Sequence, residues 1–307
     1  MKESFSANVK KEIIEKINSR SKADVCLMGL LTCCNQLSDK EISLLTENED
    51  VRDFFVKNVN RLLERDDAVL VTEQSRKNSG ALYNVEVAGS ENRIELLSMF
   101  AMDQSRRLMP DDLPKEKYLP QLAAGAFLAC GSVNDPEKKY HLEFVMPSLD
   151  LCNDFGLILI EHFDIVPKHI ERKNSQIVYI KESENIIDML AIMGAQMCAL
   201  EIMNVKMMKD MRNKINRAVN CDNANIEKTL KAAGKQLDDI ELIDRTVGFE
   251  ELSPALREMA ELRYNNPDVS LKELGSMLTP PISRSGVNHR LQKISAYADE
   301  IREKLKA

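Results

Sequence analysis

The 307-residue sequence contains no Trp, only 5% aromatic residues, and few Pro (10) or Gly (11). This composition excludes a fibrous or linker-rich chain. No apolar run reaches the roughly 18 residues that a membrane span needs, and the charged segment at the start is unlike a signal peptide. Because 44% of the residues are hydrophobic and 30% are charged, we expect two or three soluble domains in the cytoplasm and no membrane partner.

Signatures of metal and cofactor binding are also missing. The seven Cys include no Cys-x-x-Cys pair, and the four His are scattered. We therefore expect reduced thiols that pack as small apolar side chains; a zinc site from Cys26, Cys33 and Cys34 is the less favoured alternative. No glycine-rich phosphate loop and no nucleophile–base motif is present, so we expect no cofactor.

The first two thirds of the chain repeat one order of predicted elements. After a first helix capped by Ser6, the order helix, strand, helix, two strands, helix runs through residues 20–105 and again through 115–195. The predicted turns are Asn78-Ser79-Gly80 and Asn174-Ser175, and the connector between the copies is marked by Pro110, Asp111, Asp112 and Pro114. Such mixed patterns indicate an α+β fold with antiparallel sheets.

The second helix of the chain and its counterpart in the repeat carry glycines at matching positions. These helices read LMGLLTCCN (Leu27–Asn35) and AAGAFLACG (Ala123–Gly131), which align Gly29 with Gly125. Without a Cβ at these positions, the two backbones can approach closely. The pattern resembles the LAGLIDADG homing-endonuclease fold, in which two such helices pack side by side at a pseudo-two-fold axis.

The sequence departs from those nucleases at the end of each of the two helices. There the nucleases carry an acidic residue that holds a divalent metal, whereas the matching positions here are Cys34 and Cys130. A neutral thiol is a poor ligand for Mg²⁺, which prefers carboxylate oxygens. Asp39 and Asp135 lie five residues further on, beyond the expected helix ends. We therefore predict degenerate metal positions, no bound metal and no enzymatic activity.

Strand patterns stop near residue 196, and helical patterns continue to the end. Breaks are predicted near Asn220–Asp222, Gly248, Pro254, Pro267 and Pro280–Pro281. These breaks suggest an α+β domain over 1–215, a helical linker over 216–236 and an all-α domain over 237–307.

The segment Ser270–Ile294 matches a helix-turn-helix whose turn is longer than usual. Ser270 and Glu273 form a capping box, Pro280 and Pro281 end the first helix, and Ser283 caps the second. Apolar residues at helical spacing would face inward, and these are Val287, Leu291 and Ile294. The outward residues suit base edges and phosphates, and these are Arg284, Ser285, Asn288, His289, Arg290 and Lys293. The alternative is a pair of ordinary surface helices.

Charge is segregated along the chain despite a net charge of −7. The segment Val205–Lys235 contains eight basic and three acidic residues, whereas Leu237–Asp268 contains three basic and nine acidic residues. A local basic surface is therefore compatible with an acidic protein. Within the basic segment, we expect Arg212 and Arg217, with the surrounding Asn residues, to contact DNA phosphates and sugars, or the Asn residues to bend the helix.

Several long segments together resemble the WhiA family of bacterial proteins, over nearly the whole chain. They are SFSANVKKEI, AAGAFLACGSVNDPEKKYHLEF, VYIKESENIIDMLAIMGA, NVKMMKDMRNKINRAVNCDNANIEKT and LKELGSMLTPPISRSGVNHRLQKI. The resemblance implies a catalytically inactive, pseudo-symmetric LAGLIDADG-like domain followed by a helix-turn-helix similar to sigma-factor region 4. It also implies a nucleoid-associated regulator that binds double-stranded DNA and acts in sporulation or cell division, with chromosome organisation and segregation as a further role in some members.

A protein–protein scaffold with weak, non-specific DNA affinity is the rival interpretation. The predicted strands carry mixed charge, including Glu73, Glu143, Lys168 and Arg172, whereas a DNA-binding saddle would be more uniformly positive. The partner would then be another transcription regulator or RNA polymerase.

Overall fold

The computed structural model describes residues 4–76, 79–102, 105, 106, 108, 113–173 and 175–306. It divides into two compact units, Met1–Asp210 and Met211–Ala307. Asn78 and Asn174 of the two predicted turns, and Pro110 and Asp111–Asp112 of the predicted connector, lie outside the described residues.

The first unit begins with α1 (Phe5–Lys16), and its cap is two residues earlier than predicted. Ser4 has an extended backbone and accepts a hydrogen bond from the Ala7 N–H at 3.1 Å. Ser6 is inside the first turn, where its hydroxyl accepts a hydrogen bond from the Val133 N–H at 3.4 Å. The first Ser is the better cap because it stands just outside the helical backbone.

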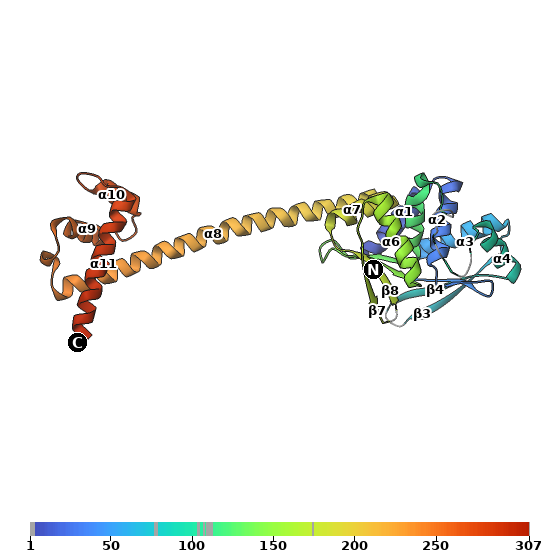
Figure 1. The fold of residues 1–307 in the computed structure, drawn as a ribbon, viewed down its shortest axis with the longest axis horizontal. Helices are drawn as coiled ribbons and strands as arrows, with labels where there is room; N and C mark the ends of the chain where they lie inside the picture. Colours follow the sequence, from blue (N-terminus) through green and yellow to red (C-terminus); the bar gives the residue numbers. More distant parts are fainter. Residues whose placement is uncertain are drawn as a thin grey trace. The chain divides into compact units, whose positions relative to one another are not determined.

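The predicted repeat is confirmed by two copies of one element order (Figure 1). The first copy consists of α2 (Arg20–Cys33), β1 (Gln36–Leu37), β2 (Ile42–Thr46), α3 (Glu49–Leu63), β3 (Val69–Arg76), β4 (Ser79–Val87) and α4 (Ser90–Met99). The second consists of the short η2 (Glu116–Tyr118), α5 (Leu119–Cys130), β5 (Gly131–Val133), β6 (Leu142–Met146), α6 (Leu149–Phe163), β7 (Lys168–Arg172), β8 (Ser175–Ile180) and α7 (Ser183–Met193).

Each copy forms an antiparallel four-stranded sheet with the same strand order, β1-β2-β4-β3 and β5-β6-β8-β7. Helices cover one face of the sheets (Figure 1). On β2, Leu44 is buried whereas Leu45 is 45% exposed, so successive side chains lie on opposite faces. The α+β, two-fold pseudo-symmetric fold class is therefore correct. β1 and β5 were not predicted because two or three residues are too few to show an alternating pattern.

Helices α2 and α5 pack against each other at the centre of the first unit, with the matching glycines at the point of contact. A Cβ on Gly29 would overlap the backbone carbonyl of Leu122, and a Cβ on Gly125 would overlap that of Cys26. No side chain larger than hydrogen fits either position without separating the two helices.

The helix α8 (Gln196–Thr246) begins in the first unit and ends in the second. It is continuous, so the predicted break near Asn220–Asp222 is wrong. Asparagine disfavours a helix by less than about 1 kcal/mol, and here Asn225 points its amide at the Cys221 sulfur one turn earlier instead of competing for backbone groups. The helix ends before Gly248, whose φ of +79° favours glycine.

The second unit continues with η3 (Phe249–Glu251), α9 (Pro254–Asn265), α10 (Leu271–Met277) and α11 (Arg284–Lys306). The breaks predicted at Gly248, Pro254, Pro267 and Pro280–Pro281 therefore lie between helices or, for Pro254, at a helix start. A separate core holds the helices together and includes Ile240, Met259, Leu274, Val287 and Leu291. Among the described residues, we find no helix with the length and apolar character to cross a membrane.

Candidate nucleic-acid interface

The capping box predicted at the start of α10 is present. The Ser270 hydroxyl accepts a hydrogen bond from the Glu273 N–H at 3.3 Å, and the Glu273 carboxylate accepts one from the Ser270 N–H at 3.1 Å. The hydrogen bond with Ser270 lowers the pKa of Glu273. Both donors at this helix start are thereby satisfied, which fixes where α10 begins.

Helix α10 is held against the turn that leads into α11. The Ile282 N–H donates to the Gly275 carbonyl at 3.0 Å, and a Cβ on Gly275 would overlap the Ile282 carbonyl. The Ser283 hydroxyl accepts a hydrogen bond from the Gly286 N–H at 3.2 Å, so Ser283 caps α11 as predicted. The helix runs to Lys306 instead of ending near Ile294, because Ala298 and Ile301 continue its buried stripe.

The first turns of α11 carry the predicted DNA-contacting residues on the outer face. Val287, Leu291 and Ile294 are buried. The exposed residues are Arg284, Ser285, Asn288, His289 and Lys293. These donors and acceptors are therefore accessible to solvent on the first turns of α11.

Arg290 differs from its neighbours because it is half-buried and contacts α9. Its guanidinium donates to the Ala255 carbonyl at 3.4 Å and lies 3.8 Å from the Glu258 carboxylate. These contacts fix the packing of α11 on α9, and a phosphate would have to compete with Glu258 for this side chain.

A groove of about 550 Å³ extends from the outer face of α11 to α8. Arg284 and Asn288 line it together with Lys228 from the basic segment of α8 and Lys272 from α10. Arg263 of α9 also lines the groove, although it is only 3% exposed. Arg263 belongs to an acidic segment of the sequence, so no local pattern predicted that it would line the same groove as Arg284.

The basic residues of α8 do not form one free surface. Lys206 pairs with Glu184, and the Lys209 ammonium donates to the carbonyls of Pro136, Glu137 and Lys138 at 2.6–3.2 Å. Both therefore interact with the first unit, so these two lysines of the basic segment Val205–Lys235 are not free cations.

The two arginines of α8 that we expect to contact DNA are solvent-exposed. Arg217 donates from Nε to the Asn213 carbonyl one turn earlier at 3.3 Å, and Arg212 is exposed on the same helix. Their remaining guanidinium donors can reach phosphate oxygens without breaking a packing contact of the core.

Cys34 and Cys130, which we predict to be degenerate metal positions, lie where α2 and α5 end. The Cys34 thiol donates to the Gln36 carbonyl at 2.9 Å, and burial raises the pKa of Cys34 to about 12. A hydrogen bond with Cys130, together with burial, raises the pKa of the Cys33 thiol. These thiols stay neutral at physiological pH and line a cavity of about 300 Å³ with Met146.

Two cations interact with the backbone carbonyls at these helix ends. Arg106 donates to the carbonyls of Cys34 at 2.6 Å and Thr32 at 3.4 Å, at the end of α2. Lys10 donates to the Leu128 carbonyl at 3.1 Å, at the end of α5. Positive charge at a helix C-terminus is favourable, and it repels a divalent cation. Among the residues the structure describes, no group of three or more His, Cys, Asp or Glu could hold a metal ion.

Lys10 gives a testable pH dependence. Burial lowers its pKa from 10.5 to about 8. Between these values the unfolded chain holds a proton that the folded protein has released, so the free energy of unfolding rises with pH. From pH 7.5 to 9.5, we expect Lys10 to contribute a rise of about 1–2 kcal/mol. Urea unfolding of the wild type and Lys10→Met at both pH values measures it as the difference between the two pH responses. An equal pH response in the two proteins would contradict the assignment.

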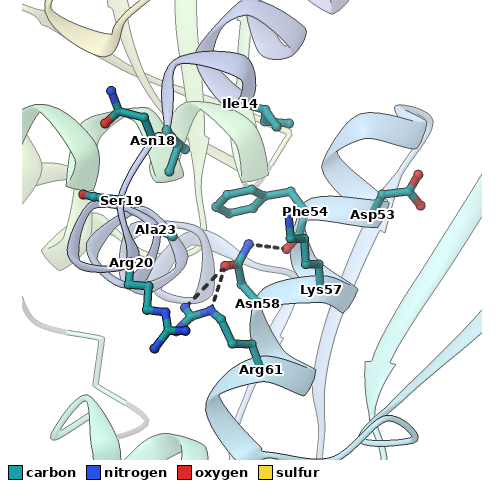
Figure 2. A pocket seen from close by; sticks show the side chains of 11 residues that line it. Ile14, Asn18, Ser19, Arg20, Ala23, Asp53, Phe54, Lys57, Asn58 and Arg61 are labelled. Atoms are coloured by element: carbon teal, nitrogen blue, oxygen red, sulfur yellow. Dashed lines mark hydrogen bonds between the residues drawn. The ribbon is translucent and has the colours of Figure 1, made fainter.

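A second cavity, of about 420 Å³, lies between α1, α2 and α3. Figure 2 shows Asn58 in its wall, with its amide donating to the Phe54 carbonyl at 2.8 Å and its oxygen accepting from Arg61. Arg61 also pairs with Asp24. Asn58, Arg61 and Asp24 thus satisfy one another's hydrogen-bonding groups, and we assign this part of the cavity wall a structural role.

Comparison with known proteins matches two family descriptions to this chain. The "WhiA LAGLIDADG-like domain" matches residues 119–212, and the "WhiA C-terminal HTH domain" matches residues 215–298. The LAGLIDADG-like match covers the second copy of the repeat. The helix-turn-helix match covers most of the second unit, including the first part of α11.

Relatives and a solved structure extend the similarity to the whole chain. A "Probable cell division protein WhiA" from Clostridium perfringens is 40% identical over 97% of this chain and 98% of the relative. One of the same name from Thermoanaerobacter pseudethanolicus is 48% identical over 67% of this chain and 62% of the relative. The crystal structure of full-length DUF199/WhiA from Thermatoga maritima covers 97% of this chain and 99% of that chain, with a TM-score of 0.59 and 23% identity, and shows the shared fold.

Proposed function

We propose that this chain, which belongs to the WhiA family, is a sequence-specific DNA-binding protein that regulates transcription and does not cut DNA. Its relatives are named probable cell division proteins, so we place the regulated genes in cell division or sporulation, with chromosome segregation as a related role. We further propose that it associates with the nucleoid.

The observation that carries the proposal is the exposed face of α11. Arg284, Ser285, Asn288 and His289 are all exposed on its first two turns. At helical spacing, Ser285 and His289 lie opposite the buried Val287, whereas Arg284 and Asn288 flank the buried stripe. Arginine suits guanine edges and asparagine suits adenine edges in the major groove. A capped α10 and the Gly275 contact position α11, which leaves its N-terminal turns free to enter that groove.

Phosphate contacts would come from Lys293, Arg212, Arg217 and Lys228, all of which are exposed. Arg290 would join them once it leaves Glu258. Each phosphate neutralised makes the logarithm of affinity fall with the logarithm of salt concentration by a slope of about 0.9.

Selection from a random duplex library with the full chain tests the proposal. We expect enrichment of a defined motif, and DNase protection of that motif when it is placed in a longer duplex. Binding to every duplex with equal affinity at physiological salt, without an enriched motif, would contradict sequence-specific recognition.

We predict that supercoiled plasmid stays intact with Mg²⁺ or Mn²⁺. The thiols of Cys34 and Cys130 and the cations Lys10 and Arg106 stand where metal-binding oxygens would be required. The assay is gel electrophoresis after incubation, with buffer lacking divalent ions as control. Reproducible cutting that disappears in Cys34→Ser or Cys130→Ser would show that the centre is active.

The alternative function is a protein–protein scaffold. It is favoured by the open faces of the two sheets, where large apolar side chains are 45–60% exposed, and these are Leu45, Leu70 and Ile170. The partner would be another transcription regulator or RNA polymerase. Cross-linking in cells, followed by separate recovery of the bound DNA and the bound proteins, distinguishes the two functions. Recovery of a defined DNA motif supports the regulator. Recovery of a partner protein without a DNA motif supports the scaffold.

A further inference from the structure

The groove beside α11 contains a buried cation that forms no ion pair with any residue that the structure describes. Arg263 is 3% exposed, and its guanidinium donates to the Val269 carbonyl at 2.7 Å. Its Nε has no hydrogen-bond partner among the described residues. Burial lowers the pKa of Arg263, which the nearby Asp268 opposes. A buried guanidinium with an unused donor is unfavourable unless an anion reaches it.

The rest of the groove suits an anionic molecule of limited size. Lys228 and Lys272 line it on α8 and α10, and Arg284 lines it on α11. Gln236 adds a buried side-chain oxygen that has no donor partner among the described residues. The cavity of about 550 Å³ is within the usual range for small-molecule sites.

We propose that this groove binds a small organic phosphate that also carries a hydroxyl or amino donor. The phosphate would accept from the Arg263 Nε–H and pair with Lys228 and Lys272, while the donor would reach the Gln236 oxygen. Arg263 is almost fully buried, so the phosphates of a DNA duplex would reach only the exposed cations at the rim of the groove. A small phosphate would reach the Arg263 Nε–H by a local shift of the side chains that cover it.

The bound molecule would control recognition because it shares two residues with DNA. Arg284 and Asn288 line the groove and also belong to the proposed base-reading face. An occupied groove would engage their side chains, so the ligand and DNA would compete. This regulatory part rests on the proposed function, whereas phosphate binding itself does not.

Nuclear magnetic resonance of the Arg263 Nε–H tests binding in the full chain without DNA. Ribose 5-phosphate is the probe, ribose is the uncharged control, and chloride keeps the ionic strength constant. We expect a saturable shift of this signal at millimolar ribose 5-phosphate and none with ribose. Lys228→Gln and Lys272→Gln should each weaken binding about tenfold, as loss of one charge-assisted hydrogen bond does.

Lys304→Gln is the matched control, because Lys304 is exposed at the far end of α11 and does not line the groove. It should leave the affinity for ribose 5-phosphate unchanged. Absence of a saturable Arg263 shift, or equal weakening in all three variants, would overturn the proposal. If Lys228→Gln weakens only DNA binding and the probe does not shift Arg263, the groove is a DNA contact and the small-ligand site is rejected. Probe binding without competition against DNA would reject the regulatory part alone.

Discussion

Gly125→Ala is expected to lower the free energy of unfolding of the first unit by about 3 kcal/mol or more. The added methyl group would overlap the backbone carbonyl of Cys26, which cannot rotate away as a side chain could. The helices α2 and α5 would have to separate, and the buried Leu27, Leu30 and Leu122 around the contact would lose packing. Urea unfolding followed by circular dichroism measures the effect, and hydrogen exchange of peptides from α2 and α5 assigns it to this helix pair.

Gly234→Ala is the matched control for that experiment. Gly234 is exposed within α8, and nothing lies within 4 Å of the position that a Cβ would take. Alanine should stabilise the helix there by about 0.5–1 kcal/mol, because glycine loses more backbone entropy. If Gly125→Ala and Gly234→Ala shifted stability in the same direction, close approach at the twin glycines would not be what holds the first unit together.

The features of the fold that could be predicted are those indicated by residues only a few positions apart in the sequence. The capping box of Ser270 and Glu273 needs residues three apart, and the buried stripe of α11 needs residues three or four apart. Gly29 and Gly125 occupy matching positions in two similar helices, and the same strand pattern follows each helix. This recurrence indicated that the two helices pack against each other. Element type and order followed from these local signals.

The features that could not be predicted depend on contacts between distant residues. Lys10 reaches Leu128, and Arg106 reaches Cys34, so neither cation could be assigned to a helix end from its own neighbours in the sequence. Arg263 stands among acidic residues in the chain but lines a basic groove in the fold. The break expected at Asn220–Asp222 was wrong because a few asparagines of weak helix propensity do not outweigh their long helical surroundings.

Arg284→Ala is expected to weaken binding to the selected duplex by about 5- to 150-fold, equivalent to roughly 1–3 kcal/mol. Arg284 is the first residue of α11, is exposed, and does not belong to the buried apolar core of the second unit. Its loss should therefore leave the fold intact. Fluorescence anisotropy with the selected duplex and with every single base-pair change shows whether discrimination disappears at one position.

The pattern of effects across variants separates base reading from phosphate contact. Asn288→Ala should relax preference at a different base pair, whereas Lys293→Gln should weaken all duplexes alike and reduce the salt slope by about 0.9. Lys304→Gln, which removes one positive charge from the far end of the same helix, should change neither. If Arg284→Ala instead behaved like Lys293→Gln, the first turn of α11 would lie along the DNA backbone, and sequence recognition would have to come from another face of the second unit.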